Sequence, residues 1–238
     1  MENTKNSIQN PTSAEAYVNR GNKLYNQGDY QAAISDYDAA IRINPDDARA
    51  YYNRGIAKSE LGKHFEAISD YDQAIRLAPS DARAYGNRGN AKGKLGHPEA
   101  AILDYDEVIR INPDDTRAYY NRGNAKGKLG KHFEAISDYD QAIRLNPEHV
   151  RAYCNRGNAK KRLGHPEAAI ADYDEVIRLD PEHVQAYNNR GIAKKELGDL
   201  EAAISDYDAA IRIDPNYATA RTNRENAEKE LRERQKET

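Results

Sequence analysis

The most regular chemistry in this chain belongs to asparagine. One asparagine recurs every 34 residues, at Asn19, Asn53, Asn87, Asn121, Asn155, Asn189 and Asn223. A primary carboxamide carries donors and an acceptor together, so it can bind both the N–H and the C=O of an extended peptide backbone. Asparagine is also a mediocre helix former, because its amide competes with the backbone. Its recurrence at one spacing therefore indicates a role beyond helix formation.

The other reactive side chains show no pattern of a catalytic or metal site. The histidines are His64, His97, His132, His149, His165 and His183, without the close spacing that metal ligands need. Cys154 stands between basic residues that would lower the pKa of its thiol, but no nucleophile–base pair accompanies it. We interpret Cys154 as a thiol that lines a binding groove. No glycine loop for phosphate is present, so the sequence predicts a protein that is not an enzyme and has no cofactor.

Composition limits the class of protein further. The chain has 238 residues, 32% of them charged, and no tryptophan, which is poor material for one thick core. A net charge of −3 gives no case for nucleic acid or an anionic membrane. One cysteine suits a reducing compartment, and no segment approaches the length of a transmembrane helix. We expect a soluble cytoplasmic protein, although a disulfide-free secreted protein would have a similar composition.

The elements that carry the asparagines follow the same period of 34 residues. Prolines recur with it at Pro11, Pro45, Pro79, Pro113, Pro147, Pro181 and Pro215. A strict period of this length is typical of a solenoid, in which each unit buries its apolar face against its neighbours. We number the places of a unit from its first residue. The predicted units are 14–47, 48–81, 82–115, 116–149, 150–183 and 184–217, with a flexible lead at 1–13 and a half-unit at 218–238.

Each unit is expected to form two helices. In the second unit the first helix spans about 48–61, behind Asp47 as a candidate N-cap, and stops at Gly62. The second helix spans about 65–77 and ends before Pro79, because the residue before a proline is disfavoured in a helix. No segment carries convincing strand alternation. The sequence predicts an all-α chain of six antiparallel helical hairpins.

The segment 118–147, AYYNRGNAKGKLGKHFEAISDYDQAIRLNP, resembles the tetratricopeptide repeat. The resemblance rests on aromatics at places 4 and 24, small residues at places 8, 20 and 27, and proline at place 32. It covers 14–217, with Asn-Arg-Gly at places 6–8 as in a bacterial type, and 218–238 resembles the family's capping helix. It implies an α-solenoid in a right-handed superhelix. Place 7, commonly leucine in the family, is arginine in every unit.

Helix geometry assigns the tyrosines to the core, with the glycines at place 8 leaving a gap for the next helix. The tyrosines of place 4 are Tyr17, Tyr51, Tyr85, Tyr119, Tyr153 and Tyr187, and those of place 24 are Tyr37, Tyr71, Tyr105, Tyr139, Tyr173 and Tyr207. We expect no binding role for these twelve.

The same geometry places cations on the inward side, where they need partners because an unpaired buried charge is costly. They are the arginines of place 7 (Arg20, Arg54, Arg88, Arg122, Arg156, Arg190) and the lysines of place 11 (Lys58, Lys92, Lys126, Lys160, Lys194). The expected partners are the aspartates of place 23: Asp36, Asp70, Asp104, Asp138, Asp172 and Asp206. We expect ordinary i,i+4 surface pairs between places 25 and 29, such as Asp38 with Arg42 and Asp140 with Arg144.

The remaining face of the first helices holds places 2, 5, 6, 9, 12 and 13. The resemblance implies that first helices line a concave groove, and that members with an asparagine ladder there bind peptides with little sequence selectivity. The candidate peptide-binding residues are Asn19, Asn53, Asn87, Asn121, Asn155 and Asn189 at place 6, Asn90, Asn124 and Asn158 at place 9, the basic Arg49, Arg83, Arg117, Arg151, Lys94, Lys128 and Arg162, and the aromatic Tyr52 and Tyr120. Formal charge on this face adds to +6, which predicts an acidic partner.

Alternatives remain open at this point. The asparagines could bond between neighbouring helices and set the repeat angle, and the basic face could simply be solvated. The chain could also be a self-assembling scaffold that forms a homo-oligomer, or an RNA-binding helical repeat. Net acidity and few groove aromatics for base stacking disfavour RNA. In family members that clamp a terminal carboxylate, place 5 carries a lysine that this chain lacks, so an internal acidic segment is the favoured ligand.

Overall fold

The computed structural model describes residues 12–237, which form thirteen helices and no strand. The first six are α1 (Ala14–Asn26), α2 (Tyr30–Ile43), α3 (Ala48–Glu60), α4 (His64–Leu77), α5 (Ala82–Lys94) and α6 (Pro98–Ile111). The others are α7 (Thr116–Lys128), α8 (His132–Leu145), α9 (Val150–Arg162), α10 (Pro166–Leu179), α11 (Val184–Glu196), α12 (Leu200–Ile213) and α13 (Ala218–Glu237). The all-α fold expected from the sequence is confirmed.

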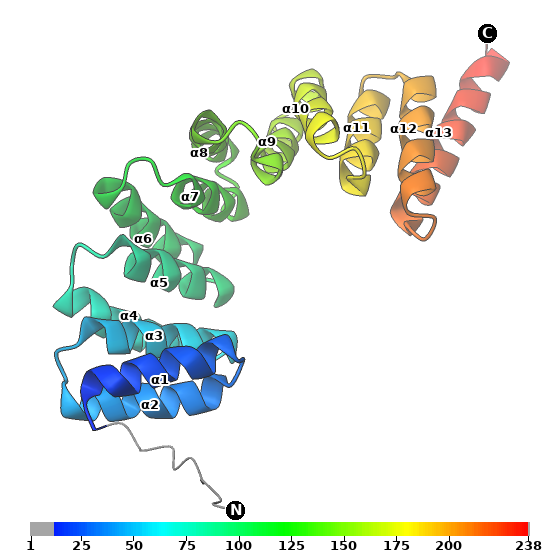
Figure 1. Cartoon of the computed structure of the whole chain (residues 1–238). Helices are drawn as coiled ribbons and strands as arrows, with labels where there is room; N and C mark the ends of the chain where they lie inside the picture. The colour runs from blue at the N-terminus through cyan, green and yellow to red at the C-terminus, as the bar shows by residue number, and fades with distance from the viewer. Residues whose placement is uncertain (1–11, 238) are drawn as a thin grey trace, which may run out of the picture. The chain divides into compact units, whose positions relative to one another are not determined.

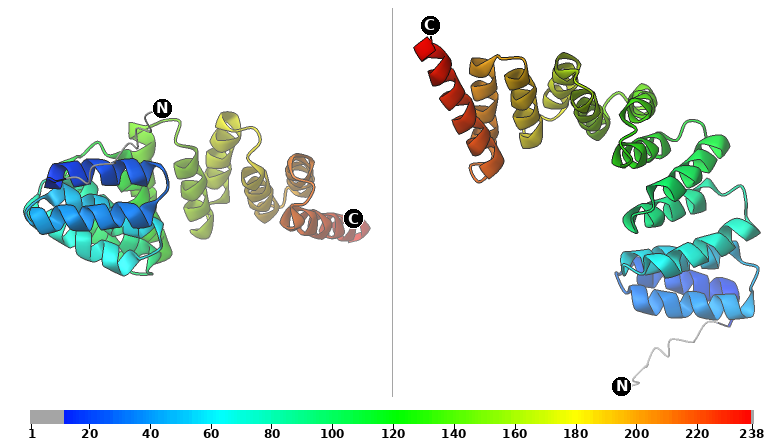
Figure 2. Two further views of the ribbon diagram at one scale, coloured as in Figure 1. Left: turned by 60° about the horizontal axis from the view of Figure 1, so that its bottom comes forward. Right: turned by 180° about the vertical axis from the view of Figure 1, so that it is seen from behind.

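The chain divides into two compact units, residues 1–113 and 114–238, and each is described by itself. In the first unit, α1 to α6 form three antiparallel hairpins, and the second helix of one hairpin packs on the first helix of the next (Figures 1 and 2). In the second unit, α7 to α12 repeat this arrangement and α13 packs against α12. The stacked hairpins are those of the expected α-solenoid. The handedness of a superhelix stays a prediction.

Helix boundaries follow the local signals in the sequence. The Asp47 side chain caps α3 by accepting a hydrogen bond from the Arg49 amide at 3.0 Å. After α3 the chain reverses at Gly62, whose φ of +74° lies in the left-handed region that glycine tolerates. His149 and His183 cap α9 and α11, because their rings accept from the amides three residues later. These two histidines are therefore helix caps.

The core of each hairpin is a tyrosine ring laid against a glycine. The place-24 tyrosines are at most 5% exposed, and a Cβ added to Gly55 would lie 2.7 Å from the Tyr71 ring. The place-4 tyrosines are only partly buried, and each lies beneath the guanidinium of its own place-7 arginine, as Tyr153 does with Arg156 at 5.3 Å. The place-24 ring fills the gap at place 8, and the place-4 ring supports the arginine.

The inward arginines and lysines find the expected aspartates. In α9, Arg156 Nη2 lies 2.6 Å from Asp172 Oδ1, and Lys160 Nζ lies 2.9 Å from Asp172 Oδ2. Burial lowers the pKa of Arg156, but the hydrogen bonds that its guanidinium donates to Asp172 and Asp140 outweigh burial, and the pKa is raised. Arg54, Arg88, Arg122 and Arg190 bind their place-23 aspartates in the same way. The predicted arginine/lysine-to-aspartate ladder is confirmed.

The place-25 aspartates do not form the surface pairs expected from the sequence. Asp38, Asp140 and Asp174 instead bind the place-7 arginine of the following hairpin, as Asp140 binds Arg156 Nη1 at 2.6 Å. Four place-29 arginines, Arg76, Arg110, Arg144 and Arg178, bond a glutamine or glutamate three residues earlier, as Arg144 does with Gln141. The i,i+4 expectation was wrong because the guanidinium has a second N–H edge that reaches the preceding hairpin.

Two glycines of one helix give a direct test of this core. In α5, a Cβ on Gly89 would lie 2.9 Å from the Tyr105 ring, whereas a Cβ on Gly93 would meet nothing within 4 Å. We expect Gly89→Ala to destabilise the first unit by about 1–3 kcal/mol through overpacking. Gly93→Ala should be neutral or stabilise it by up to about 1 kcal/mol, through helix propensity. Denaturant unfolding of both variants measures the difference, and equal stabilities would contradict the packing.

Candidate functional site

The face of the first helices is organised by carboxamides that reach from one hairpin to the previous one. The Asn155 amide nitrogen donates to Asn124 Oδ1 at 2.8 Å and to the Tyr120 hydroxyl at 3.3 Å. In the first unit, Asn53 donates to Asn22 Oδ1 at 2.9 Å and Asn87 donates to the Tyr52 hydroxyl at 3.1 Å. The place-6 asparagine therefore joins consecutive first helices.

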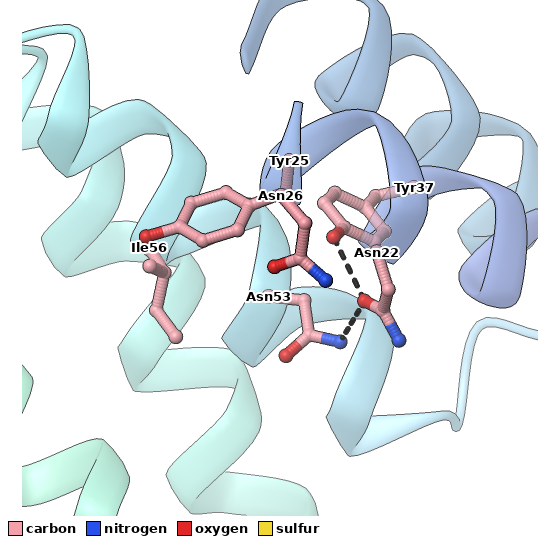
Figure 3. Close-up of a pocket in the computed structure, with 6 residues that line it drawn as sticks. All are labelled: Asn22, Tyr25, Asn26, Tyr37, Asn53 and Ile56. Carbon is pink, nitrogen blue, oxygen red and sulfur yellow. Dashed lines mark hydrogen bonds between the residues drawn. The ribbon is translucent and has the colours of Figure 1, made fainter. Parts of the chain in front are cut away.

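The tyrosine hydroxyls of the second helices donate hydrogen bonds into the same network. The place-24 hydroxyl donates to the place-9 asparagine of its own hairpin in four cases: Tyr37 to Asn22, Tyr105 to Asn90, Tyr139 to Asn124 and Tyr173 to Asn158. Figure 3 shows the hydroxyl of Tyr37 and the amide of Asn53 both meeting the oxygen of Asn22. One place-9 carboxamide thus accepts from both hairpins.

Across α9, α11 and α13 the network is continuous. Asn223 on α13 donates to Asn188 Oδ1 at 2.9 Å, and Asn188 donates to Asn189 Oδ1 at 3.3 Å. Asn189 in turn donates to Asn158 Oδ1 on α9 at 3.2 Å. Asn188 is 2% exposed, and hydrogen bonds are stronger in a buried environment, so these bonds hold the helices together.

The donor edges of Asn53, Asn87, Asn155 and Asn189 are therefore engaged between helices, as the architectural alternative expected. Within residues 12–237, the Oδ1 atoms of Asn53, Asn87 and Asn155 accept no hydrogen bond, and Asn19 on the terminal helix α1 makes none. The geometry thus favours a contact in which the asparagine oxygen accepts a peptide N–H, over one in which oxygen and NH₂ group both bind the peptide backbone. Peptide binding by this ladder stays a prediction.

Pockets recur at equivalent points between successive first helices. One of about 310 Å³ lies between α1 and α3, lined by Asn22, Tyr25, Asn26, Tyr37, Asn53 and Ile56 (Figure 3). Another of about 480 Å³ lies between α9 and α11, where Lys161, Arg162 and Glu196 join the amides. A third of about 380 Å³ lies between α11 and α13. The hollow recurs at these three steps of the repeat, and places 12 and 13 set its charge.

The positive charge of this face is smaller in the first unit than the sequence predicted. Arg83 binds Asp81 through Nε and Nη2 at 2.9 and 2.7 Å, and Arg49 binds Asp47 in the same way. Those aspartates stand at place 34, outside the places that give +6. In the second unit the difference lies at Arg151, where His149 stands in place of the place-34 aspartate.

Free positive charge gathers on α9. In the part of the chain that the structure describes, Arg151, Lys161 and Arg162 form no ion pair. Lys94, Arg117 and Lys128 are exposed on α5 and α7.

The two aromatic candidates are tied into contacts between helices. Tyr52 packs against Tyr71 at a centroid distance of 6.2 Å and lies beneath the Arg83 guanidinium at 5.0 Å. Tyr120 packs against Tyr139 at 6.2 Å and against the His149 ring at 4.8 Å. Their rings thus support the face as well as bordering it.

Cys154 differs from the sequence-based expectation. Burial raises the pKa of its thiol, and the Asn158 side chain opposes this only in part, so the expected lowering by basic neighbours was wrong. Residues 12–237 contain no group of three histidine, cysteine or acidic side chains placed to hold a metal ion. No helix of that range is long and apolar enough to span a bilayer.

Comparison with known proteins gives one consistent result. Family models described as "TPR repeat" match residues 21–62, 57–96 and 127–164, and models described as "Tetratricopeptide repeat" match 82–115, 104–137 and 154–218. No curated protein matches the chain in sequence.

Solved structures share the fold. YrrB, described as "a TPR protein with an unusual peptide-binding site", is 25% identical, with a TM-score of 0.70 over 79% of this chain and 97% of YrrB. A tetratricopeptide repeat protein from Parabacteroides merdae is 23% identical, with a TM-score of 0.75 over 94% of this chain and 89% of its own. A MamA chain from Desulfovibrio magneticus, described as residue 41 to the end, is 23% identical, with a TM-score of 0.69 over 73% of this chain and 98% of that one.

The bonds between helices predict a stability cost at place 6. Asn155→Ala removes two hydrogen bonds and leaves the Asn124 oxygen with one donor, so we expect the second unit to lose about 1–2 kcal/mol of unfolding free energy. Asn19→Ala is the matched control, since Asn19 makes no hydrogen bond within residues 12–237, and it should be neutral or slightly stabilising. Urea unfolding measures both. Equal small effects would show that the Asn155 bonds contribute nothing to stability.

Proposed function

Because the chain belongs to the tetratricopeptide repeat family, we propose that it is an adaptor that binds an extended acidic protein segment along α7, α9 and α11. The fold supports a protein–protein interaction module. The proposal adds where the ligand binds and what charge it carries. It confines the strongest contact to the second unit, where Arg151, Lys161 and Arg162 of α9 form no ion pair within residues 12–237.

The α9–α11 pocket is the observation that carries the proposal. Lys161 and Arg162 line it beside Asn158 and Asn189, and both cations are without an ion pair in residues 12–237. An aspartate or glutamate side chain of a ligand can bind these cations at the surface without displacing an internal partner. Glu196 in the same lining leaves the three charged groups at a net charge of +1.

The asparagines supply a contact that does not depend on ligand sequence. Asn155 keeps its amide hydrogens on Asn124 and Tyr120, while its Oδ1 accepts no bond from residues 12–237. An extended peptide can donate a backbone N–H to this oxygen, so the grip uses one edge of the carboxamide. The similarity to YrrB, whose printed description includes a peptide-binding site, supports a peptide as the ligand class.

Self-assembly is the second candidate, and one observation favours it. Phe65, Leu103 and Phe133 on the second helices are 69%, 66% and 71% exposed. Large exposed apolar side chains mark sites of protein contact when they gather in a patch. A mass that rises with protein concentration, together with no affinity for acidic peptides, would select this candidate.

The test is charge reversal on α9 against a matched reversal elsewhere. Lys161→Glu with Arg162→Glu should weaken binding of a fluorescein-labelled (Gly-Glu-Ser-Glu)₃ peptide by at least about tenfold, and added salt should shrink the difference. Arg144→Glu with Arg178→Glu makes the same change in net charge on α8 and α10 and should have a much smaller effect. Fluorescence anisotropy gives the dissociation constants.

Two results would contradict the proposal. Equal weakening by both pairs of substitutions would show that net charge alone attracts the peptide. A dissociation constant that does not change with salt would remove the electrostatic contact with α9.

A further inference from the structure

The buried hydroxyl of Tyr207 does not take part in the hydrogen-bond network that binds four of the other place-24 tyrosines. Tyr207 is 0% exposed, and its hydroxyl has no hydrogen-bond partner within residues 12–237. The equivalent hydroxyls of Tyr37, Tyr105, Tyr139 and Tyr173 each donate to a place-9 asparagine. A buried donor left without an acceptor is costly, so it needs an explanation.

The cause is a single residue type at place 9. Asparagine gives way to isoleucine there in two hairpins, at Ile56 and Ile192. In the earlier hairpin place 12 is Ser59, whose hydroxyl interacts with that of Tyr71; burial raises the pKa of Tyr71, and this interaction opposes the rise. In the last hairpin place 12 is Lys195, which has no acceptor to offer. The hydroxyl of Tyr207 therefore lacks an acceptor that the other hairpins supply.

Tyr207 lies in the lining of the pocket between α11 and α13. Ile192 forms an apolar wall, and Asn223 and Asn226 of α13 face the same space of about 380 Å³. At the mouth, Lys195 binds Glu230 at 3.2 Å, and the two side chains are 33% and 37% exposed. An exposed pair of this kind is weak and can open for an entering group.

The charge of the lining selects the occupant. Lys195 and Arg234 both bind Glu230, and Glu196 adds a second negative charge, so these four groups together carry no net charge. A carboxylate would therefore meet no net positive charge and would approach Glu196, and an ammonium has no acceptor for the tyrosine hydrogen. A neutral carboxamide satisfies both demands, because its oxygen accepts from the hydroxyl and its NH₂ group can donate to Glu196.

We propose that the α11–α13 pocket is a subsite for a glutamine or asparagine side chain, whose amide oxygen accepts a hydrogen bond from the Tyr207 hydroxyl. This deepens the proposed function, since the side chain would belong to a peptide on the same face. The amide subsite would select the ligand's side chain, whereas the asparagine contact with the peptide backbone does not depend on ligand sequence. A bound peptide would then carry an amide side chain near the end of the face that α13 closes.

The experiment uses single amino-acid probes on the whole chain, so it does not depend on peptide binding along α9. N-acetyl-glutamine amide and N-acetyl-glutamate amide are titrated while NMR follows the Ile192 methyl groups and the side-chain amides of Asn223 and Asn226. We expect saturable shifts, with binding of the glutamine probe at least about threefold tighter. Tyr207→Phe should weaken the glutamine probe about fivefold, the loss of one hydrogen bond, while Tyr173→Phe should leave it unchanged.

Melting temperature provides the second readout. Tyr207→Phe removes a hydroxyl without a partner and should leave the melting temperature unchanged or higher, whereas Tyr173→Phe loses its bond to Asn158 and should lower it. Equal lowering by both variants would show that the Tyr207 hydroxyl is already satisfied and would overturn the proposal. Absence of saturable shifts, or equal affinity for the two probes, would also overturn it. If these probes bind and the acidic peptide does not, the subsite stands and the α9 proposal fails.

Discussion

The arginine at place 7 is the constraint on which the rest of the structure depends. A residue that is commonly apolar in this family is here a cation between two helices, so carboxylates must surround it. Arg156 meets that demand with Asp172 of its own hairpin and Asp140 of the preceding one, while the Tyr153 ring supports its guanidinium. Second-helix aspartates are thereby fixed inside the stack. The opposite face of the first helices is left to carboxamides and to the remaining cations.

The carboxamide network explains why asparagine recurs at two places of the unit. Place 6 donates to the preceding hairpin, and place 9 accepts from the place-6 amide of the following hairpin and from the tyrosine hydroxyl of its own hairpin. One side chain thus sets the spacing of neighbouring helices, while the Oδ1 atoms of Asn53 and Asn155 accept no hydrogen bond within residues 12–237. Architecture and peptide recognition are therefore not exclusive readings of the ladder. The hairpins whose place 9 is isoleucine depart from the pattern, and there the pocket differs in chemistry.

Much of this was predictable from the sequence, because the fold repeats. Period, capping residues and turn glycines located the hairpins, and the inward arginines required the aspartates that bind them. The partners of Asp140 and of Arg83 were not predictable from one helical unit, since both depend on geometry beyond the six counted places. The pKa of Cys154 depends on burial that the sequence does not display. A signal for Tyr207 was present, because place 9 reads asparagine in four hairpins and isoleucine in two while place 24 never changes.

The most direct test of this account is a pair of double-mutant cycles on Arg156, combining Arg156→Met with Asp172→Asn and with Asp140→Asn. Hydrogen exchange of backbone amides in α9 and α10 gives the local opening free energies, which suits an array that need not unfold in one step. We predict a coupling of about 3 kcal/mol for Arg156 with Asp172, which is 3% exposed. Coupling with Asp140, which is 50% exposed, should be below about 1 kcal/mol. Couplings near zero in both cycles would contradict the claim that this arginine organises the stack.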